Sequence, residues 1–85
     1  MIIIYNKRFL KRFDELPLKI QEQFNMRITL FTENKFHPLL NNHTLSGVYR
    51  GCRSINISGD LRAVFREDGE TVVFICLGTH SQLYG

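Results

Sequence analysis

The feature that most constrains this chain is a change in the spacing of its apolar residues near Gly47. Before that point apolar residues recur at helical intervals, whereas after it they alternate with polar residues along short runs. Helices and strands of this kind each have an apolar face to bury, so the two halves are expected to pack on each other. At 85 residues the chain has room for one domain, which we expect to span residues 1–85 as an α+β fold.

The first half predicts a short strand followed by two helices. β-Branched and aromatic residues favour a strand over residues 2–5, and Asn6 is placed to cap a helix over about residues 7–15. Pro17 suits the first turn of a second helix. The buried stripe of this second helix is expected to comprise Ile20, Phe24, Ile28 and Phe31. Residues 33–47 contain Asn, Pro and Gly at intervals, which indicates an ordered loop.

The second half predicts three antiparallel strands, near residues 48–58, 60–66 and 71–78. Tight turns at Gly59 and Gly69 would join them. Successive side chains of a strand point to opposite faces of the sheet. The face under the helices is therefore expected to carry Leu61, Ala63, Phe65, Val73, Ile75 and Leu77.

The opposite face of these strands is expected to mix arginines with apolar side chains. By the same alternation it carries Arg62, Val64, Arg66, Val72, Phe74 and Cys76. Exposed apolar groups beside cations predict a partner that buries this surface.

Positive charge is concentrated in two places along the chain, whose formal net charge is +3. Residues 43–66 contain four arginines against the single acid Asp60. Residues 1–12 contain four cations and no acid, and these cations stack at a spacing of four on the first predicted helix: Lys7, Arg8, Lys11 and Arg12. An anionic partner is therefore expected.

Targeting signals and cysteine usage favour a cytoplasmic protein. The longest apolar runs, residues 2–5 and 72–77, are far shorter than the about 20 residues that cross a bilayer. The first cations follow the first apolar run, whereas in a secretory signal they precede it. Cys52 and Cys76 are too few for a disulfide scaffold, so we expect free thiols.

Residues able to do chemistry gather in the second half: His43, Asn56, Asp60, Arg62, Cys76, His80 and Tyr84. Arginine stabilises a pentacovalent phosphorane and histidine exchanges protons near neutral pH, so this set suits phosphodiester chemistry. The plainer alternative is a solvated set of strand, turn and loop residues. A zinc site built from the two cysteines and two of the histidines is a weaker hypothesis, because these residues lack the paired spacing of zinc ligands. The carboxylates occupy helix ends and turns, which disfavours a two-metal nuclease.

The same half carries the motifs by which the chain resembles a known family. These motifs are His-x-Leu-x-Gly at His43, Leu45 and Gly47, then Arg53, then Gly59-Asp60-x-Arg62 with Arg66, and Gly78-x-His80-x-x-Leu83-Tyr84. Together with the preceding strand and helix pair, they resemble the RelE/ParE superfamily of bacterial toxins, and most closely its YafQ-like branch. The resemblance implies two N-terminal helices packed on a curved, mainly antiparallel β-sheet.

The resemblance also implies a type II toxin-antitoxin system toxin, a ribosome-dependent endoribonuclease that cuts translated mRNA without a metal or other cofactor. In such cleavage the ribose 2′-hydroxyl is the nucleophile. Matching positions make His80 the general acid and either His43 or Asp60 the base, with Arg62 on the phosphate. RNA contacts are expected at Tyr84, Arg66, Arg53, Lys7, Arg8, Lys11 and Arg12. A cognate antitoxin is expected to cover Val64, Val72 and Phe74.

Three positions depart from the family pattern. Asn56 stands where the branch commonly has a histidine, Leu61 where an aromatic residue occurs, and Cys76 where an arginine occurs. These changes remove one proton-exchanging group and one cation. RNA cleavage by this chain is therefore expected to be weaker than in the family, differently tuned, or absent. The principal alternative is a non-enzymatic binding module of the same fold, such as a ParE-like gyrase inhibitor or a degenerate toxin. His80, a residue that ParE relatives generally lack, favours the ribonuclease.

Overall fold

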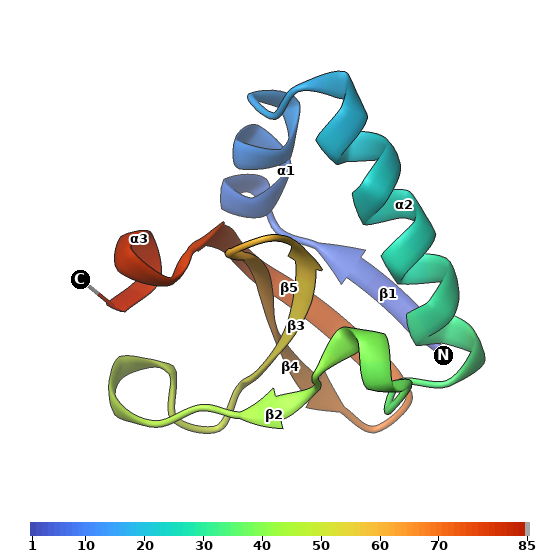
Figure 1. Cartoon of the computed structure of the whole chain (residues 1–85). Helices are drawn as coiled ribbons and strands as arrows, with labels where there is room; N and C mark the ends of the chain where they lie inside the picture. Colours follow the sequence, from blue (N-terminus) through green and yellow to red (C-terminus); the bar gives the residue numbers. More distant parts are fainter. Residues whose placement is uncertain (85) are drawn as a thin grey trace.

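In the computed structural model, which describes residues 1–84, two helices cover one face of a five-stranded sheet (Figure 1). The elements in chain order are β1 (Ile2–Tyr5), α1 (Lys7–Asp14), α2 (Leu18–Glu33), the 3-10 helix η1 (Pro38–Leu40), β2 (His43–Thr44), the 3-10 helix η2 (Gly47–Tyr49), β3 (Arg53–Ser58), β4 (Leu61–Asp68), β5 (Thr71–Thr79) and α3 (His80–Tyr84). The short helix α3 lies against the opposite face, where Leu83 packs with Val64 and Cys76.

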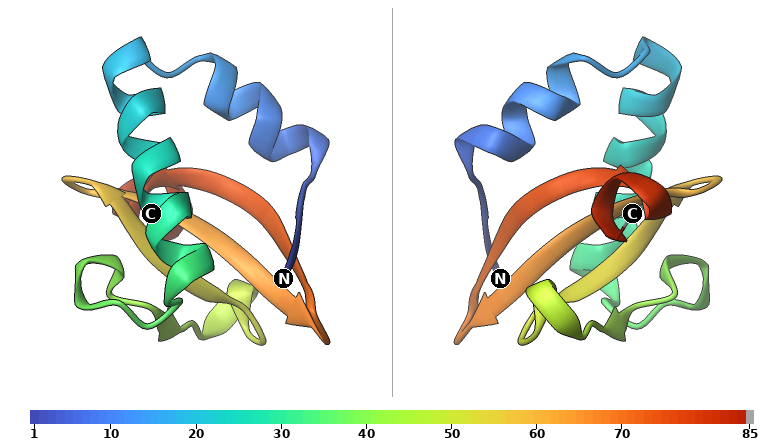
Figure 2. Two further views of the ribbon diagram at one scale, coloured as in Figure 1. Left: turned by 90° about the vertical axis from the view of Figure 1, so that its right-hand side faces the viewer. Right: turned by 90° about the vertical axis from the view of Figure 1, so that its left-hand side faces the viewer.

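The strand order is β1-β5-β4-β3-β2. β1 runs parallel to β5, and every other pairing is antiparallel. The two hairpin turns place Gly59 and Gly69 at φ values of 52° and 61°, a backbone region that favours glycine. Figure 2 shows that the sheet is strongly curved. The expected fold class, with its mainly antiparallel sheet, is therefore confirmed.

The first half folds as its sequence predicts. The Asn6 side chain caps α1 by accepting a hydrogen bond from the backbone N–H of Phe9 at 2.8 Å. Pro17 immediately precedes α2, whose Phe24 and Phe31 are buried in the core. Within residues 1–84, no helix combines the length and the apolar character that a membrane span requires.

Aromatic side chains dominate the core between the helices and the sheet. Phe31 of α2 lies 5.1 Å from Phe65 of β4, measured between ring centroids. Phe9 of α1 lies 5.6 Å from Phe74 of β5. Each of these four rings is at most 1% exposed. Such packing of large apolar rings holds both helices on the sheet.

The loop between α2 and β3 contains more structure than its composition predicts. Its residues include η1, the two-residue strand β2 and η2. Because η2 occupies Gly47–Tyr49, β3 begins only at Arg53 and not near residue 48. β2 pairs with the start of β3, which brings His43 opposite Ser54.

The predicted alternation fails on β5 because of a β-bulge. Immediately after Val64 of β4 the register on β5 jumps, and Ile75 has no partner in the ladder. Before the bulge, Val72 and Phe74 point toward the helices and are 3% and 0% exposed. The prediction that Val72 and Phe74 lie on the arginine-bearing face is therefore wrong, as is the placement of Ile75 under the helices.

The apolar patch predicted on the other face is likewise absent as a surface. Val64 does face that side, but α3 covers it and leaves it 0% exposed. Its neighbours there include Cys76, Leu83 and Tyr49. Val64, Val72 and Phe74 are therefore buried in this fold and form no exposed docking patch, and antitoxin binding at them stays a prediction.

Candidate active site

A cleft of about 410 Å³ opens beside α3 on the face of the sheet opposite α1 and α2. It is lined by His43, Thr44, Leu45, Ser46, Arg62, His80 and Tyr84. These residues come from β2 and the loop after it, from β4 and from α3. Four of the residues predicted to act on RNA thus meet around one hollow.

Cross-strand pairing explains how residues far apart in sequence meet there. His43, Ser54, Val64 and Cys76 form one continuous row across β2, β3, β4 and β5. A neighbouring row joins Asn56, Arg62 and Gly78 across β3, β4 and β5. α3 begins directly after β5, so its side chains stand over these rows.

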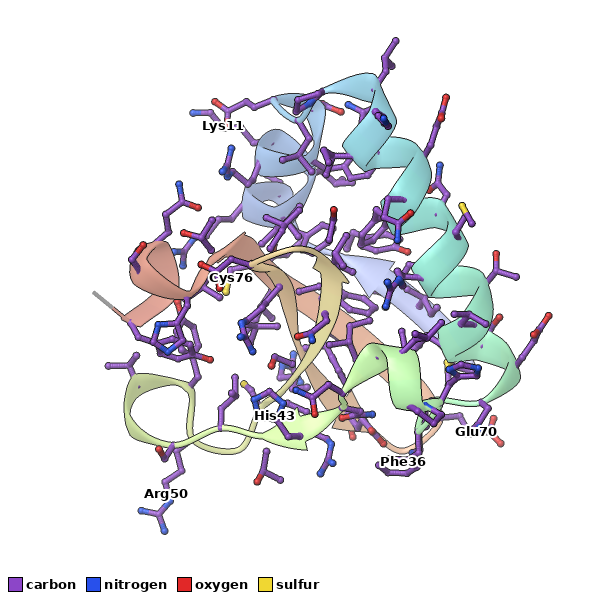
Figure 3. All side chains as sticks on the ribbon, in the orientation of Figure 1. Lys11, Phe36, His43, Arg50, Glu70 and Cys76 are labelled. Carbon is purple, nitrogen blue, oxygen red and sulfur yellow. The ribbon has the colours of Figure 1, made fainter. Side chains whose placement is uncertain are left out.

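His43 is held by the loop that precedes it. Its Nδ1 lies 2.8 Å from the carbonyl oxygen of Asn41, which can only accept a hydrogen bond. Nδ1 therefore carries the proton, and Nε2 of the neutral ring is an acceptor. Oγ of Ser54, a fully buried hydroxyl, donates to Nε2 at 3.4 Å. This geometry makes Nε2 of His43 a competent proton acceptor. In Figure 3 His43 is labelled on β2.

Arg62 has an unsatisfied donor. Its Nε is buried and has no hydrogen-bond partner among residues 1–84. The nearest carboxylate oxygen, Oδ1 of Asp60, lies 3.9 Å away, which is too far for a hydrogen bond. Leaving a buried donor unpaired costs about 1–3 kcal/mol, more when the group is charged. The Arg62 side chain also lines the cleft, so its guanidinium is placed to meet an anion there.

Asp60 acts on α3 rather than on the cleft. Its Oδ2 accepts a hydrogen bond from the backbone N–H of His80 at 3.3 Å, which links the β3–β4 turn to the start of α3. The carboxylate is 57% exposed and is not among the residues that line the cleft. Of the two predicted bases, the cleft therefore contains His43.

His80 and Tyr84 stand one turn apart on α3. Their ring centroids are 4.9 Å apart, and the ring of Tyr49 packs edge-on against Tyr84 at 5.8 Å. Burial raises the pKa of Tyr84, so its hydroxyl remains a hydrogen-bond donor at neutral pH. The cleft thus combines two histidines, an arginine and a phenol.

The other predicted RNA contacts lie elsewhere. Nε of Arg53 donates to Oδ1 of Asn42 at 2.7 Å, and the guanidinium lies over the ring of Phe36. Arg66 is exposed and lines no part of the cleft. A second cleft, between α1 and α3, includes Arg8, Lys11 and Arg12. Lys7 is exposed and lines neither cleft.

The three departures from the family pattern have different surroundings. Asn56 lies opposite Arg62 on the neighbouring strand, and its Oδ1 is also buried without a partner. Leu61 belongs to the core under the helices. Cys76 is buried beneath α3 and only 2% exposed, so its expected position on an open face is wrong. Cys76 and Cys52 are free thiols.

Some groups around the cleft were not anticipated from the sequence. Gln82 accepts hydrogen bonds from the backbone N–H of Thr79 at 2.9 Å and from Nη2 of Arg12 at 3.2 Å. Tyr49 lies in η2, where alternation gives no signal for its contact with Tyr84. Across residues 1–84, no three His, Cys, Asp or Glu side chains form a set that could hold a metal ion.

A family model that covers nearly the whole chain defines the class of this protein as a bacterial toxin of a type II toxin-antitoxin system. Residues 3–85 match the family described as the bacterial toxin of a type II toxin-antitoxin system, YafQ, and the chain belongs to that family. The resemblance inferred from the motifs is thereby confirmed. A search of curated proteins gave no match.

Solved toxin structures share the fold at low sequence identity. YafQ from E. coli strain BL21(DE3) is 20% identical with a TM-score of 0.78, over 98% of this chain and 97% of that one. In the E. coli DinJ-YafQ complex the matching chain is 19% identical with a TM-score of 0.66, over 98% and 97%. A chain of the RelB-RelE antitoxin-toxin complex from Methanococcus jannaschii is 18% identical with a TM-score of 0.74, over 95% and 94%.

Proposed function

We propose that this chain is the toxin of a type II toxin-antitoxin pair and that it acts in the cytoplasm as an endoribonuclease, cutting translated mRNA on the ribosome. The observation that carries the proposal is a single cleft lined by two histidines, an arginine and a phenol, namely His43, His80, Arg62 and Tyr84. The Arg62 guanidinium could donate to a scissile phosphate held in this cleft. Membership of the YafQ toxin family supports the same conclusion.

The reaction requires no metal for its balance of atoms and protons. The ribose 2′-oxygen attacks phosphorus while Nε2 of His43 accepts the hydroxyl proton. The bond between phosphorus and the 5′-oxygen then breaks, and His80 donates a proton to the leaving oxygen. The products are a 2′,3′-cyclic phosphate and a 5′-hydroxyl. Arg62 stabilises the charge that develops on the phosphorane.

The remaining cleft residues position these groups. Asp60 fixes the start of α3 through the backbone of His80 and thereby orients the acid, although its carboxylate is outside the cleft. Tyr84 offers a ring for base stacking and a hydroxyl that can donate to phosphate. Arg53 and Arg66 assist RNA binding only through long-range attraction.

A cognate antitoxin is the proposed protein partner, because structurally similar toxins were crystallised in the DinJ-YafQ and RelB-RelE complexes. Because the apolar residues once expected to bind it are buried, direct neutralisation would occupy the cleft itself. Carboxylates of the antitoxin would then pair with Arg62 and with the rim around His80.

The test is cleavage of an mRNA on programmed ribosomes by the purified protein. We expect wild-type products with 5′-hydroxyl ends and 2′,3′-cyclic phosphates, the end groups that attack by the ribose 2′-oxygen leaves. His80→Ala and Arg62→Gln should each lower the rate by about 10²–10⁴-fold. Arg50→Gln is the matched control, because Arg50 is exposed and points away from the body of the molecule (Figure 3). It should cleave at the wild-type rate.

Circular dichroism of each variant establishes that the fold is retained. A folded His80→Ala protein that cleaves as fast as wild type would remove His80 as the acid. A wild-type protein that leaves mRNA intact but blocks DNA supercoiling by gyrase would replace the ribonuclease with the gyrase inhibitor of the same fold.

A further inference from the structure

The second cleft, between α1 and α3, has a volume of about 330 Å³ and a cationic lining. Arg8, Lys11 and Arg12 contribute to it from α1, with Glu15 as the single acid in the lining. Both α1 and α3 line this second cleft, and both clefts border α3. Three cations against one acid make this hollow a site for an anion.

α3 separates the two clefts and is seated closely on the sheet. His80 and Tyr84 face the first cleft, whereas Gln82 and Leu83 face the second. Gly78 permits this seating, because a Cβ atom there would lie 3.2 Å from Oε1 of Gln82 and 3.4 Å from the Leu83 side chain. The partition between the clefts is therefore one short helix.

Aromatic rings lead from the first cleft toward the second. His80 contacts Tyr84, and Tyr84 contacts Tyr49, at centroid distances of 4.9 and 5.8 Å. A hydrogen bond with Cys76 is the main cause that raises the pKa of Tyr49, and the nearby Arg8 guanidinium opposes it. Arg8, which lines the second cleft, is therefore near enough to Tyr49 to act on its phenol.

We propose that the second cleft binds a phosphate of the same RNA strand, next to the scissile phosphate, with Arg8, Lys11 and Arg12 as its ligands and with the strand crossing α3 over Tyr84. Proteins hold single strands in this way, with cations along the backbone and aromatic rings under the bases. The inference rests on RNA being the substrate, as proposed above.

Arg12 is already oriented for such a contact. Its Nη2 donates to Oε1 of Gln82 at 3.2 Å, and the same oxygen accepts from the backbone N–H of Thr79. A guanidinium has five N–H donors, so this bond leaves others for a phosphate. Gln82 is therefore a positioning residue that couples the cationic cleft to the helix carrying His80.

The experiment compares cleavage by wild type and by the double variant Arg8→Gln/Arg12→Gln, on ribosomes programmed with mRNA. The mRNA is intact or carries one uncharged methylphosphonate beside the cleavage site, on either side in turn. For wild type, one of the two substitutions should raise KM about tenfold and leave kcat nearly unchanged. The double variant should show the raised KM with intact mRNA and no further loss with the methylphosphonate.

The matched control is Lys19→Gln/Arg50→Gln, which removes the same charge from two exposed residues that line neither cleft. It should keep the wild-type response to the methylphosphonate. If the neutral phosphate weakens the Arg8→Gln/Arg12→Gln variant as much as wild type, the cleft does not bind that phosphate. Unchanged cleavage with a loss of antitoxin affinity would make the cleft part of the antitoxin interface and overturn the proposal.

Binding of each protein to the programmed ribosomes is measured alongside cleavage. Phosphate-dependent binding through the cleft by a wild-type protein that does not cut would refute the nuclease and support the cleft assignment. Cutting without any effect of the methylphosphonate on either side would refute the cleft assignment and support the nuclease.

Discussion

The two faces of the sheet differ in how completely their side chains are packed and hydrogen-bonded. Under α1 and α2, the rings of Phe9, Phe31 and Phe74 are at most 1% exposed and pack at centroid distances of 5.6 to 5.7 Å. On the opposite face, Nε of Arg62 and Oδ1 of Asn56 are buried without partners among residues 1–84. The first face is complete without a ligand, whereas the second carries the open cleft lined by His43, Arg62 and His80. Stability is therefore expected to reside mainly on the first face and activity on the second.

The bulge at Ile75 allows β5 to contribute buried side chains to both faces of the sheet. Before the bulge, Val72 and Phe74 complete the aromatic core, while Cys76 beyond it supports α3. Without the extra residue, one of these sets would point to the wrong face. The two faces are thus separate in composition but share one strand.

The strongest test of this difference between the two faces is to remove the Phe74 side chain from the core. Phe74→Ala removes a ring that contacts Phe9, Phe31 and Phe65, and we expect it to lower the free energy of unfolding by about 3–5 kcal/mol. For a domain of this size that is a large part of the total stability. Urea denaturation followed by circular dichroism measures the change.

Phe36 provides the matched control for this substitution. Its ring is 58% exposed and contacts only the cations Lys35 and Arg53 among the aromatic and cation–π interactions of the described residues. Phe36→Ala should lower the unfolding free energy by about 1 kcal/mol or less. Equal losses for Phe36→Ala and Phe74→Ala would contradict the assignment of stability to the helix-side face.

Sequence patterns predicted most of this fold because each pattern is local. The Asn6 cap, the apolar stripe of α2 and the glycine turns need only neighbouring residues to specify them. The alternation rule failed at Phe74 because a bulge depends on pairing with β4, which no spacing on β5 reveals.

The cleft was predicted in part. Family motifs identified His43, Arg62, His80 and Tyr84, and these four do converge. The motifs did not reveal the second cleft or the hydrogen bond between Arg12 and Gln82, because those contacts join α1 to α3 across 70 residues of sequence. Contacts between distant elements leave no periodic signal in either one.

Gly78→Ala tests the other face, because it disturbs the seat of α3 and leaves the aromatic core intact. Gly78→Ala places a methyl group 3.2 Å from the flexible tip of Gln82 and 3.4 Å from Leu83. We expect a stability change of about 1 kcal/mol or less, because these side chains can adjust. Cleavage should fall about tenfold, because a displaced Gln82 no longer accepts from the backbone N–H of Thr79 and the start of α3, which carries His80, loses that anchor.

Ser81→Ala is the control for Gly78→Ala, since Ser81 is an exposed residue of the same helix and lines neither cleft. Its cleavage rate should stay at the wild-type value. If Gly78→Ala cleaves normally while losing several kcal/mol of stability, the separation of the two faces is refuted.

The smallest expected effect is a pH dependence located on the stable face. Tyr5 of β1 stacks on Phe74 at 5.5 Å, and burial raises its pKa above the ordinary value of 10.0. As pH rises through about 10, the unfolded chain releases this proton first, so ionisation favours unfolding. The stability that the protonated phenol contributes is complete below that pH and is lost as pH rises through the higher pKa of the folded state.

Tyr5→Phe removes the titrating group and keeps the ring. Urea midpoints measured from about pH 8 to pH 11 should therefore decline less steeply for Tyr5→Phe than for wild type, with the curves meeting at neutral pH. Parallel curves would mean that Tyr5 keeps its ordinary pKa in the folded protein and that this edge of the core is open to water.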